Sequence, residues 1–266
     1  MVYGDTNSTL AGALAASKLH VPVIHIEAGL RSFNMNMPEE INRILTDQVS
    51  SILFCPTEET IKNLENEGFL KNNRKTTLIK NGDVMYDIAL TMKNHAEKPI
   101  GLDGVDDGFI LVTCHRQENT DNQLTLTDIV ESLNNLHNSV APVIFPLHPR
   151  TAKMIKEFGL KTQFQVLEPV GYLEMLWFLS HCKLVLTDSG GLQKEAFFMQ
   201  KYCLTLREQT EWVELISEGV NSLVGSDKNK IITMAKQKYG TTVSANPSLY
   251  GNGTSSEQIA NYLSSL

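Results

Sequence analysis

The chain has 266 residues, of which 42% are hydrophobic and 20% charged, and its formal net charge is −7. This length predicts one or two domains with a sizeable core, and the negative charge argues against nucleic acid as a general partner. A small phosphorylated ligand stays compatible with that charge, because such sites bind phosphate through local dipoles.

The cysteines and the apolar runs bear on the compartment. Cys55, Cys114, Cys182 and Cys203 are scattered and form no C-x-x-C pair, which argues against a zinc site or a redox pair. They are typical of reduced core residues. No apolar run approaches the roughly 18 residues of a membrane span, and no signal peptide is visible. We therefore predict a cytoplasmic protein with no metal site and no membrane partner.

The first residues indicate the end of a buried strand. Residues 1–3 precede a turn at Gly4-Asp5-Thr6 and a predicted helix over residues 8–19. A parallel strand this short normally needs earlier strands beside it. About 85 to 90 residues precede the first predicted boundary, fewer than a doubly wound domain usually takes. We therefore expect the first domain to be incomplete. Asp5 is interpreted as a helix N-cap, with catalysis as the alternative.

The next predicted strand covers residues 21–26, and Glu27 follows its apolar run. Glu27 is expected to leave the sheet at the ligand face; an ion pair with Arg31 in a loop is the alternative. Pro38 predicts the start of a helix, where the carboxylates of Glu39 and Glu40 favour the helix dipole.

A strand is predicted over residues 52–55. A domain boundary is expected between about residues 84 and 108, where Pro99, Gly101, Gly104 and Gly108 accompany an acidic stretch over residues 103–107.

Strands and helices then alternate through the second half. Strands are predicted over residues 109–113, 143–147 and 184–186, with helices over residues 124–137, 151–158 and 173–180. This alternation implies a parallel sheet covered by helices on both faces. In such sheets ligands bind beyond the carboxyl ends of the strands.

Polar side chains follow several of these strands. His115 suits proton transfer near neutral pH and Arg116 suits phosphate, in a loop that also holds Glu118 and Asn119. His148 is expected either to contact a phosphate or to cap the next helix. Arg207 follows the strand-like residues 202–205, and its side chain is expected to be able to reach a phosphate.

The sequence from Asp188 to Glu195 predicts an anion site. A buried strand, then Ser189-Gly190-Gly191, then a helix leaves backbone N–H groups at a helix N-terminus, which suits phosphate. Glu195 lies one turn after Gly191, where it is placed to accept both hydroxyls of a ribose. A tight βα turn with a solvated Glu195 is the alternative.

Taken together, these motifs resemble the non-hydrolysing UDP-N-acetylglucosamine 2-epimerases, over residues 1 to about 253. The motifs that carry the resemblance are Gly4-Asp5-Thr6, His25-Ile26-Glu27-Ala28-Gly29-Leu30-Arg31, Pro38-Glu39-Glu40-Ile41-Asn42-Arg43, Pro56-Thr57-Glu58, His115-Arg116-Gln117-Glu118-Asn119, His148-Pro149 and Asp188-Ser189-Gly190-Gly191-Leu192-Gln193-Lys194-Glu195.

The resemblance implies an α/β fold of glycosyltransferase-B type, with two Rossmann-like domains. These would be a partial first domain over residues 1–88, a UDP-binding domain over residues 89–250, and a final helix over residues 251–266 that returns to the first domain. It also implies a cytoplasmic homodimer with a UDP-sugar substrate and no cofactor.

The implied reaction converts UDP-N-acetylglucosamine reversibly to UDP-N-acetylmannosamine, by elimination and re-addition of UDP through 2-acetamidoglucal. By this resemblance the acid–base candidates are Asp5, Glu27, Glu39 and His115. The expected contacts to UDP are Arg116, Glu118, Asn119, His148, Ser189, Gly190, Gly191, Glu195 and Arg207.

Two alternatives stay open. Trp212-Val213 stands where many members have Arg-Pro, and it resembles the branch that acts on UDP-2,3-diacetamido-2,3-dideoxyglucuronate. The short first domain leaves an inactive, UDP-binding fragment as the other alternative.

Overall fold

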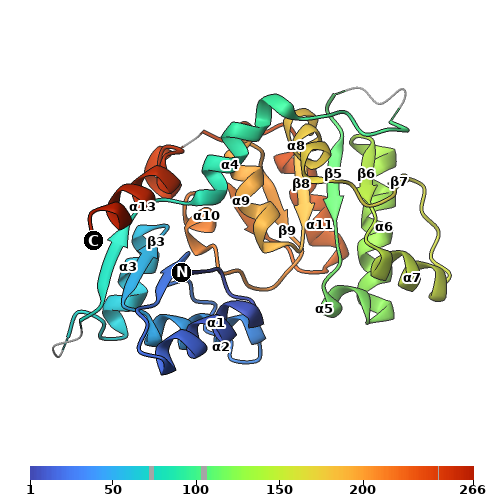
Figure 1. The fold of residues 1–266 in the computed structure, drawn as a ribbon. Coiled ribbons are helices and arrows are strands. Elements are labelled where there is room, and N and C mark those ends of the chain that lie inside the picture. Colours follow the sequence, from blue (N-terminus) through green and yellow to red (C-terminus); the bar gives the residue numbers. More distant parts are fainter. Residues whose placement is uncertain (72–74, 103–106, 245) are drawn as a thin grey trace. The chain divides into compact units, whose positions relative to one another are not determined.

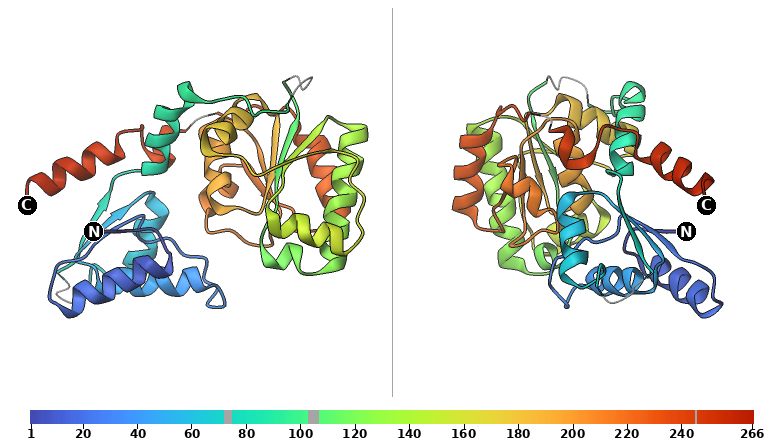
Figure 2. Two further views of the ribbon diagram at one scale, coloured as in Figure 1. Left: turned by 45° about the vertical axis from the view of Figure 1, so that its right-hand side comes forward. Right: turned by 90° about the vertical axis from the view of Figure 1, so that its left-hand side faces the viewer.

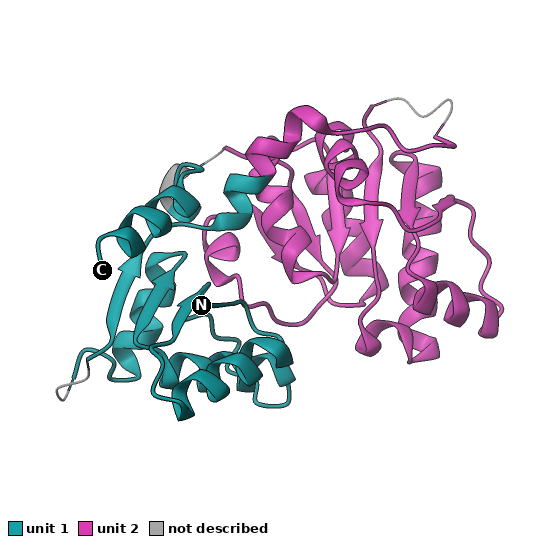
Figure 3. Cartoon of the chain, in the orientation of Figure 1, with its two compact units in different colours: residues 1–88, 246–266 teal, residues 89–245 magenta. Residues whose placement is uncertain are grey.

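A computed structural model describes residues 1–71, 75–102, 107–244 and 246–266 (Figure 1, Figure 2). The chain forms two compact units, one of residues 1–88 and 246–266 and the other of residues 89–245 (Figure 3). The return to the first unit thus begins at Asn246 rather than at residue 251. Gly104 and most of the acidic stretch of the expected boundary lie outside the described residues.

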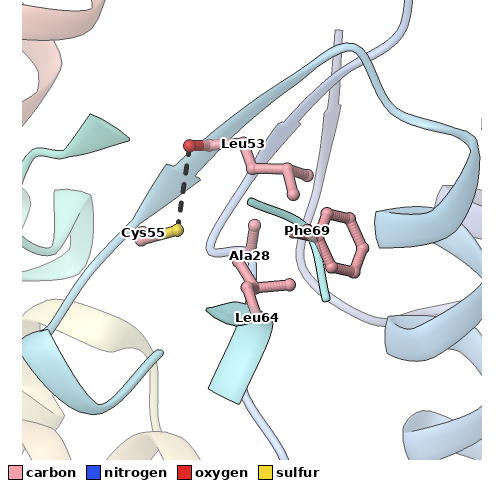
Figure 4. Packing of buried hydrophobic residues seen from close by; sticks show 5 residues of the cluster. All are labelled: Ala28, Leu53, Cys55, Leu64 and Phe69. Atoms are coloured by element: carbon pink, nitrogen blue, oxygen red, sulfur yellow. Dashed lines mark hydrogen bonds between the residues drawn. The ribbon is translucent and has the colours of Figure 1, made fainter. Parts of the chain in front are cut away.

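The first unit is built on a parallel sheet in the order β1 (Val2–Tyr3), β2 (Ile24–Ile26), β3 (Ile52–Cys55) and β4 (Thr77–Lys80). Its helices are α1 (Asn7–Lys18), α2 (Pro38–Val49), α3 (Glu58–Asn66), α12 (Pro247–Tyr250) and α13 (Ser255–Ser264), and α4 (Val84–Met92) begins in it. One core cluster joins Leu64 of α3 to Ala28, Leu53, Cys55 and Phe69 (Figure 4).

The second unit has a parallel six-stranded sheet in the order β10-β9-β8-β5-β6-β7. The strands are β5 (Ile110–Thr113), β6 (Val143–Pro146), β7 (Gln165–Leu167), β8 (Leu184–Thr187), β9 (Cys203–Thr205) and β10 (Asn221–Leu223). Chain order reverses between the neighbours β5 and β8. This doubly wound order places a topological switch point there, where α/β proteins bind ligands.

Most helices of the second unit lie in the crossovers between its strands, and α11 follows the last strand. They are the short α5 (Gln117–Thr120), α6 (Gln123–Ser139), α7 (Pro149–Glu157), α8 (Tyr172–His181), α9 (Gly190–Phe198), α10 (Val213–Ser217) and α11 (Lys228–Lys238), after a 3₁₀ turn over Lys93–His95. Helices α6 and α11 pack side by side (Figure 2). The α/β class with parallel sheets is confirmed. Within the described ranges, no helix is long and apolar enough to cross a membrane.

All four cysteines are free and buried. Burial raises the pKa of Cys182 and of Cys203 to about 12. The pKa of Cys55 is likewise raised, and that of Cys114 rises through burial and the adjacent charge of Asp188.

We expect these thiols to resist iodoacetamide in the folded protein at pH 8. The thiolate is the nucleophile, and a raised pKa keeps the thiol protonated until well above pH 8. In urea the thiols return to a pKa of about 8.5 and should be alkylated. Mass spectrometry before and after unfolding measures this; rapid alkylation of the native chain would contradict it.

Candidate active site

A cavity of about 420 Å³ opens at the switch point of the second unit. It lies beyond the carboxyl ends of β5, β6 and β8, and its wall also includes the loop that leads into α8. Several residues singled out from the sequence line it, namely His115, His148, Ser189, Gly191 and Glu195. A pocket in this place and of this size suits a nucleotide-sized ligand.

The Ser-Gly-Gly turn enters this cavity from β8. Ser189 is the N-cap of α9, and its hydroxyl accepts a hydrogen bond from the N–H of Leu192. Gly190 and Gly191 are the first two helical residues, and N–H groups at that position have no acceptor within the helix. The cavity therefore receives the positive end of α9, which favours an anion.

Glu195 lies one turn further along α9, and 8% of it is exposed. It lines the cavity together with Tyr172. Burial, and secondarily the charge of Glu195, raises the pKa of Tyr172 to about 12. Glu195 is thus a buried acidic group at the pocket wall, rather than the solvated Glu of the alternative interpretation.

Asp188 organises the loop that carries His115. Its buried carboxylate accepts hydrogen bonds from the backbone N–H groups of His115 and Arg116 and from the side-chain amide of Asn119. Its Oδ1 also lies 3.3 Å from Nδ1 of His115, whose side chain is 41% exposed. The sequence indicated Asp188 only as part of the motif from Asp188 to Glu195. Its position directly after β8 was the available signal.

His148 caps the next helix, as one of the two expectations had it, and it also lines the cavity. Its Nδ1 accepts a hydrogen bond from the N–H of Arg150 and so caps α7. With Nδ1 as acceptor, the ring proton lies on Nε2, which can donate to an anion. The ring also lines the cavity, and its centroid is 5.5 Å from that of His115.

The other expected UDP contacts lie around this wall. Arg116 donates from Nε to the carbonyl of Asp188, and Asn119 also donates to the carbonyl of Leu206. Arg207 is buried and pairs with Glu211 at 3.0 Å and with Glu118 at 3.8 Å. Within the described part of the chain, Arg116, Glu118, Asn119, Gly190 and Arg207 are absent from the cavity lining.

Sequence reasoning also missed a segment of the wall. Pro169, Val170 and Gly171 line the cavity ahead of α8, as does Met175 within that helix. Only the proline and glycine signalled a loop there.

The first unit gathers carboxylates at the ends of β1 and β2. The N-cap of α1 is Thr6, not Asp5, because the Thr6 hydroxyl accepts from the N–H of Thr9. Asp5 instead forms an ion pair with the buried Arg43 of α2, at 3.1 Å. Its carboxylate is one-third exposed and lies beside a permanent positive charge.

Glu27 has an unusual backbone, with a φ of 70°. Non-glycine residues seldom adopt a positive φ, and such strain concentrates at functional sites. A Cβ built on Gly4 would lie 3.5 Å from Oε2 of Glu27, so the side chain passes close to the turn before Asp5. Arg31 does not support the alternative, since its ion pairs are with Asp47 and Glu67.

Glu39 and Glu40 occupy the first turn of α2, as Pro38 predicted, but they differ in environment. Glu39 is half-buried. Glu40 is fully buried and accepts from the N–H groups of Ser32 and Phe33 and from Nε of Arg43. Glu40 therefore holds the loop after β2 in addition to any effect on the helix dipole.

The fold and the pocket define a class: a doubly wound α/β protein with a cavity at its switch point that receives a helix N-terminus, and with carboxylates at the strand ends of its first unit. A sequence model described as UDP-N-acetylglucosamine 2-epimerase matches residues 1–264. The chain belongs to the UDP-N-acetylglucosamine 2-epimerase family, whose members are isomerases of glycosyltransferase-B fold.

Relatives and solved structures agree with this assignment. UDP-2,3-diacetamido-2,3-dideoxy-D-glucuronate 2-epimerase of Pseudomonas aeruginosa is 61% identical, over 100% of this chain and 74% of that protein. UDP-N-acetylglucosamine 2-epimerase of Methanocaldococcus jannaschii is 43% identical, over 99% of this chain and 74% of that protein. A crystal structure of the Methanocaldococcus jannaschii enzyme with UDP-GlcNAc and UDP has a TM-score of 0.87 at 42% identity, over 100% of this chain and 75% of that one.

Proposed function

We propose that the chain inverts C2 of a UDP-linked 2-acetamido sugar, with UDP-2,3-diacetamido-2,3-dideoxy-D-glucuronate as substrate. The observation that carries the choice of sugar is the 61% identity to the Pseudomonas aeruginosa enzyme of that name, against 43% to the UDP-N-acetylglucosamine 2-epimerase of Methanocaldococcus jannaschii. The pair Trp212-Val213 supports the same choice. UDP-N-acetylglucosamine is the second candidate, supported by the family.

The proposed chemistry needs an acid, a base and a stabilised leaving group. A base takes the C2 proton while the C1–O bond breaks, so that UDP leaves and a C1–C2 double bond forms. A proton then adds to C2 on the other face, and UDP adds back to C1. Because no carbonyl activates the C2 proton, the base must be well placed. Asp5, Glu27 and Glu39 of the first unit and His115 of the second are the proposed proton-transfer groups.

UDP is proposed to bind the second unit. The N-terminus of α9 at Ser189, Gly190 and Gly191 would hold the diphosphate, with Nε2 of His148 as a further donor. The uracil ring of UDP would lie against the loop of residues 169–171. The outer contacts Arg116, Glu118, Asn119 and Arg207 are proposed to support this site.

Proton NMR in D2O tests the function. The purified chain is incubated separately with the diacetamido-glucuronate and with UDP-N-acetylglucosamine. Deuterium at C2 and a new manno-type anomeric signal with the first sugar are expected. Turnover of UDP-N-acetylglucosamine alone would overturn the substrate assignment. Broadened UDP signals without exchange in either sugar would overturn the epimerase proposal in favour of a binding protein.

The ribose contact gives a separate prediction. Replacing Glu195 by glutamine should weaken UDP binding about tenfold, since hydrogen bonds to a charged acceptor contribute roughly 1.5–3 kcal/mol. Calorimetric titration with UDP and with 2′,3′-dideoxy-UDP separates the ribose contact from a general effect. The affinity for the dideoxy nucleotide should be the same in both proteins. An equal loss for both nucleotides would contradict the ribose assignment.

We also propose that the chain forms a homodimer, on the strength of the family resemblance alone. Light scattering during gel filtration distinguishes the dimer from a monomer of 29.6 kDa.

A further inference from the structure

A buried histidine underlies the turn that carries Asp5. His25 is the central residue of β2 and has no exposed surface. Its Nε2 lies 2.9 Å from the carbonyl oxygen of Gly4, and its Nδ1 lies 2.6 Å from Oδ1 of Asp47 in α2. A carbonyl oxygen only accepts, so Nε2 donates to it. The imidazole ring therefore joins α2 to the residue immediately before Asp5.

The same carboxylate also holds the turn that carries Glu27. Oδ2 of Asp47 accepts from the N–H of Gly29 at 3.1 Å and from Nη1 of Arg31 at 2.8 Å. Gly29 lies two residues after Glu27 and has a φ of 79°. A Cβ there would approach the carbonyl oxygen of Thr60 to 2.5 Å, so the turn has little room to shift.

This arrangement is an unusual way to build a core. Strands of a parallel sheet are buried on both faces and normally carry apolar residues at their centre. Buried ion pairs seldom stabilise a fold more than apolar side chains of the same volume would. Yet His25 and Asp47 are both fully buried. Their shared feature is that each contacts a turn bearing a proton-transfer candidate.

We propose that Asp47 and His25 are positioning residues. Together they fix the turns that carry Asp5 and Glu27 at the carboxyl ends of β1 and β2. The role in catalysis rests on the proposed function. The structural part, that one buried carboxylate fixes both turns, does not depend on the substrate.

The test compares two isosteric substitutions in one network. In Asp47→Asn, the donors His25, Gly29 and Arg31 compete for a single remaining oxygen. The matched control is Glu67→Gln, which removes the other carboxylate that pairs with Arg31, at 2.5 Å; that carboxylate bonds the Arg31 side chain rather than the backbone of residues 4–6 or 27–29. His25→Gln is a second variant, because glutamine can hold either Asp47 or the Gly4 carbonyl but not both.

Hydrogen–deuterium exchange gives the readout that is independent of substrate. We expect faster exchange over residues 4–6 and 27–29, by about tenfold or more, in Asp47→Asn and His25→Gln but not in Glu67→Gln. Unchanged exchange of both turns in a folded Asp47→Asn or His25→Gln protein would overturn the proposal. This holds even if the wild-type protein turns over no sugar, which would refute the proposed function separately.

Kinetics gives the second readout. Misplacing catalytic groups by about 1 Å costs on the order of 100-fold in rate. We therefore expect kcat to fall by about that factor in Asp47→Asn and His25→Gln, with KM and UDP affinity within about twofold of wild type. Glu67→Gln should keep its kcat. Equal losses of kcat in Asp47→Asn and Glu67→Gln would show that Asp47 and His25 have a structural role only, and would overturn their role as positioning residues.

Discussion

The Glu27→Gln variant is expected to lose about a thousandfold in kcat, because a positioned acid or base typically contributes 10²- to 10⁴-fold. Glutamine preserves the shape of the side chain but can neither accept nor deliver a proton at this site. The φ of 70° at this position should be kept, because glutamine has the same shape as glutamate. A strained non-glycine residue persists only where the surrounding structure fixes it, which is why we place the largest catalytic effect here.

The measurement is the rate of C2 deuterium incorporation in D2O, read beside the rate of epimerisation. Glu58→Gln is the matched control, since Glu58 is a 63% exposed carboxylate of the same unit that pairs with Lys80 at the surface. The control should keep wild-type rates, and both variants should bind UDP as the wild type does. Wild-type turnover in Glu27→Gln would remove Glu27 from the proton-transfer groups.

In both units the sequence predicted the strands that are apolar runs and missed those that are short and partly polar. Strands β5, β6 and β8 are nearly continuous apolar runs, and each was placed to within a residue or two. Strands β7 and β10 were not predicted, because Gln165-Val-Leu and Asn221-Ser-Leu are short and partly polar. Strand β4 was not predicted for a similar reason, because the polar residues Thr77 and Lys80 at its two ends are typical of a loop.

Residues that line the cavity were predicted where they lie close together in one sequence motif. Hydrogen-bonded pairs were missed where their two partners lie far apart in the sequence. Ser189, Gly191 and Glu195 are close in sequence and line one wall of the cavity. Asp47 stands 22 residues from His25, and Asp188 stands 73 residues from His115. No local pattern joins such pairs. For the same reason Asp5 was interpreted as a cap, because its partner Arg43 comes from another element.

Asp188→Asn is expected to have the largest combined effect on stability and turnover. The carboxylate is fully buried, and its oxygens accept from His115 N, Arg116 N and the Asn119 amide at 2.9 to 3.1 Å. Asparagine turns one of these acceptors into a donor that faces other donors. A hydrogen bond to a charged acceptor contributes roughly 1.5–3 kcal/mol, so weakening two of them costs roughly 3–6 kcal/mol. We expect a loss of about that size in the free energy of unfolding, measured with urea.

The same substitution should lower kcat by about 100-fold, because the loop of His115 loses the group that fixes it. Asp121→Asn is the matched control on the adjacent loop, where an exposed carboxylate pairs with Arg150. The pair is bidentate but largely exposed to solvent, so its loss should lower the free energy of unfolding far less than Asp188→Asn does and leave turnover nearly unchanged. If Asp188→Asn unfolded at the wild-type urea concentration and kept wild-type turnover, Asp188 would contribute neither to stability nor to the ordering of the His115 loop. If it lost stability alone, the His115 loop would hold its geometry without this carboxylate, and the ordering of the proton-transfer group would have to come from elsewhere in the β5–α5 turn.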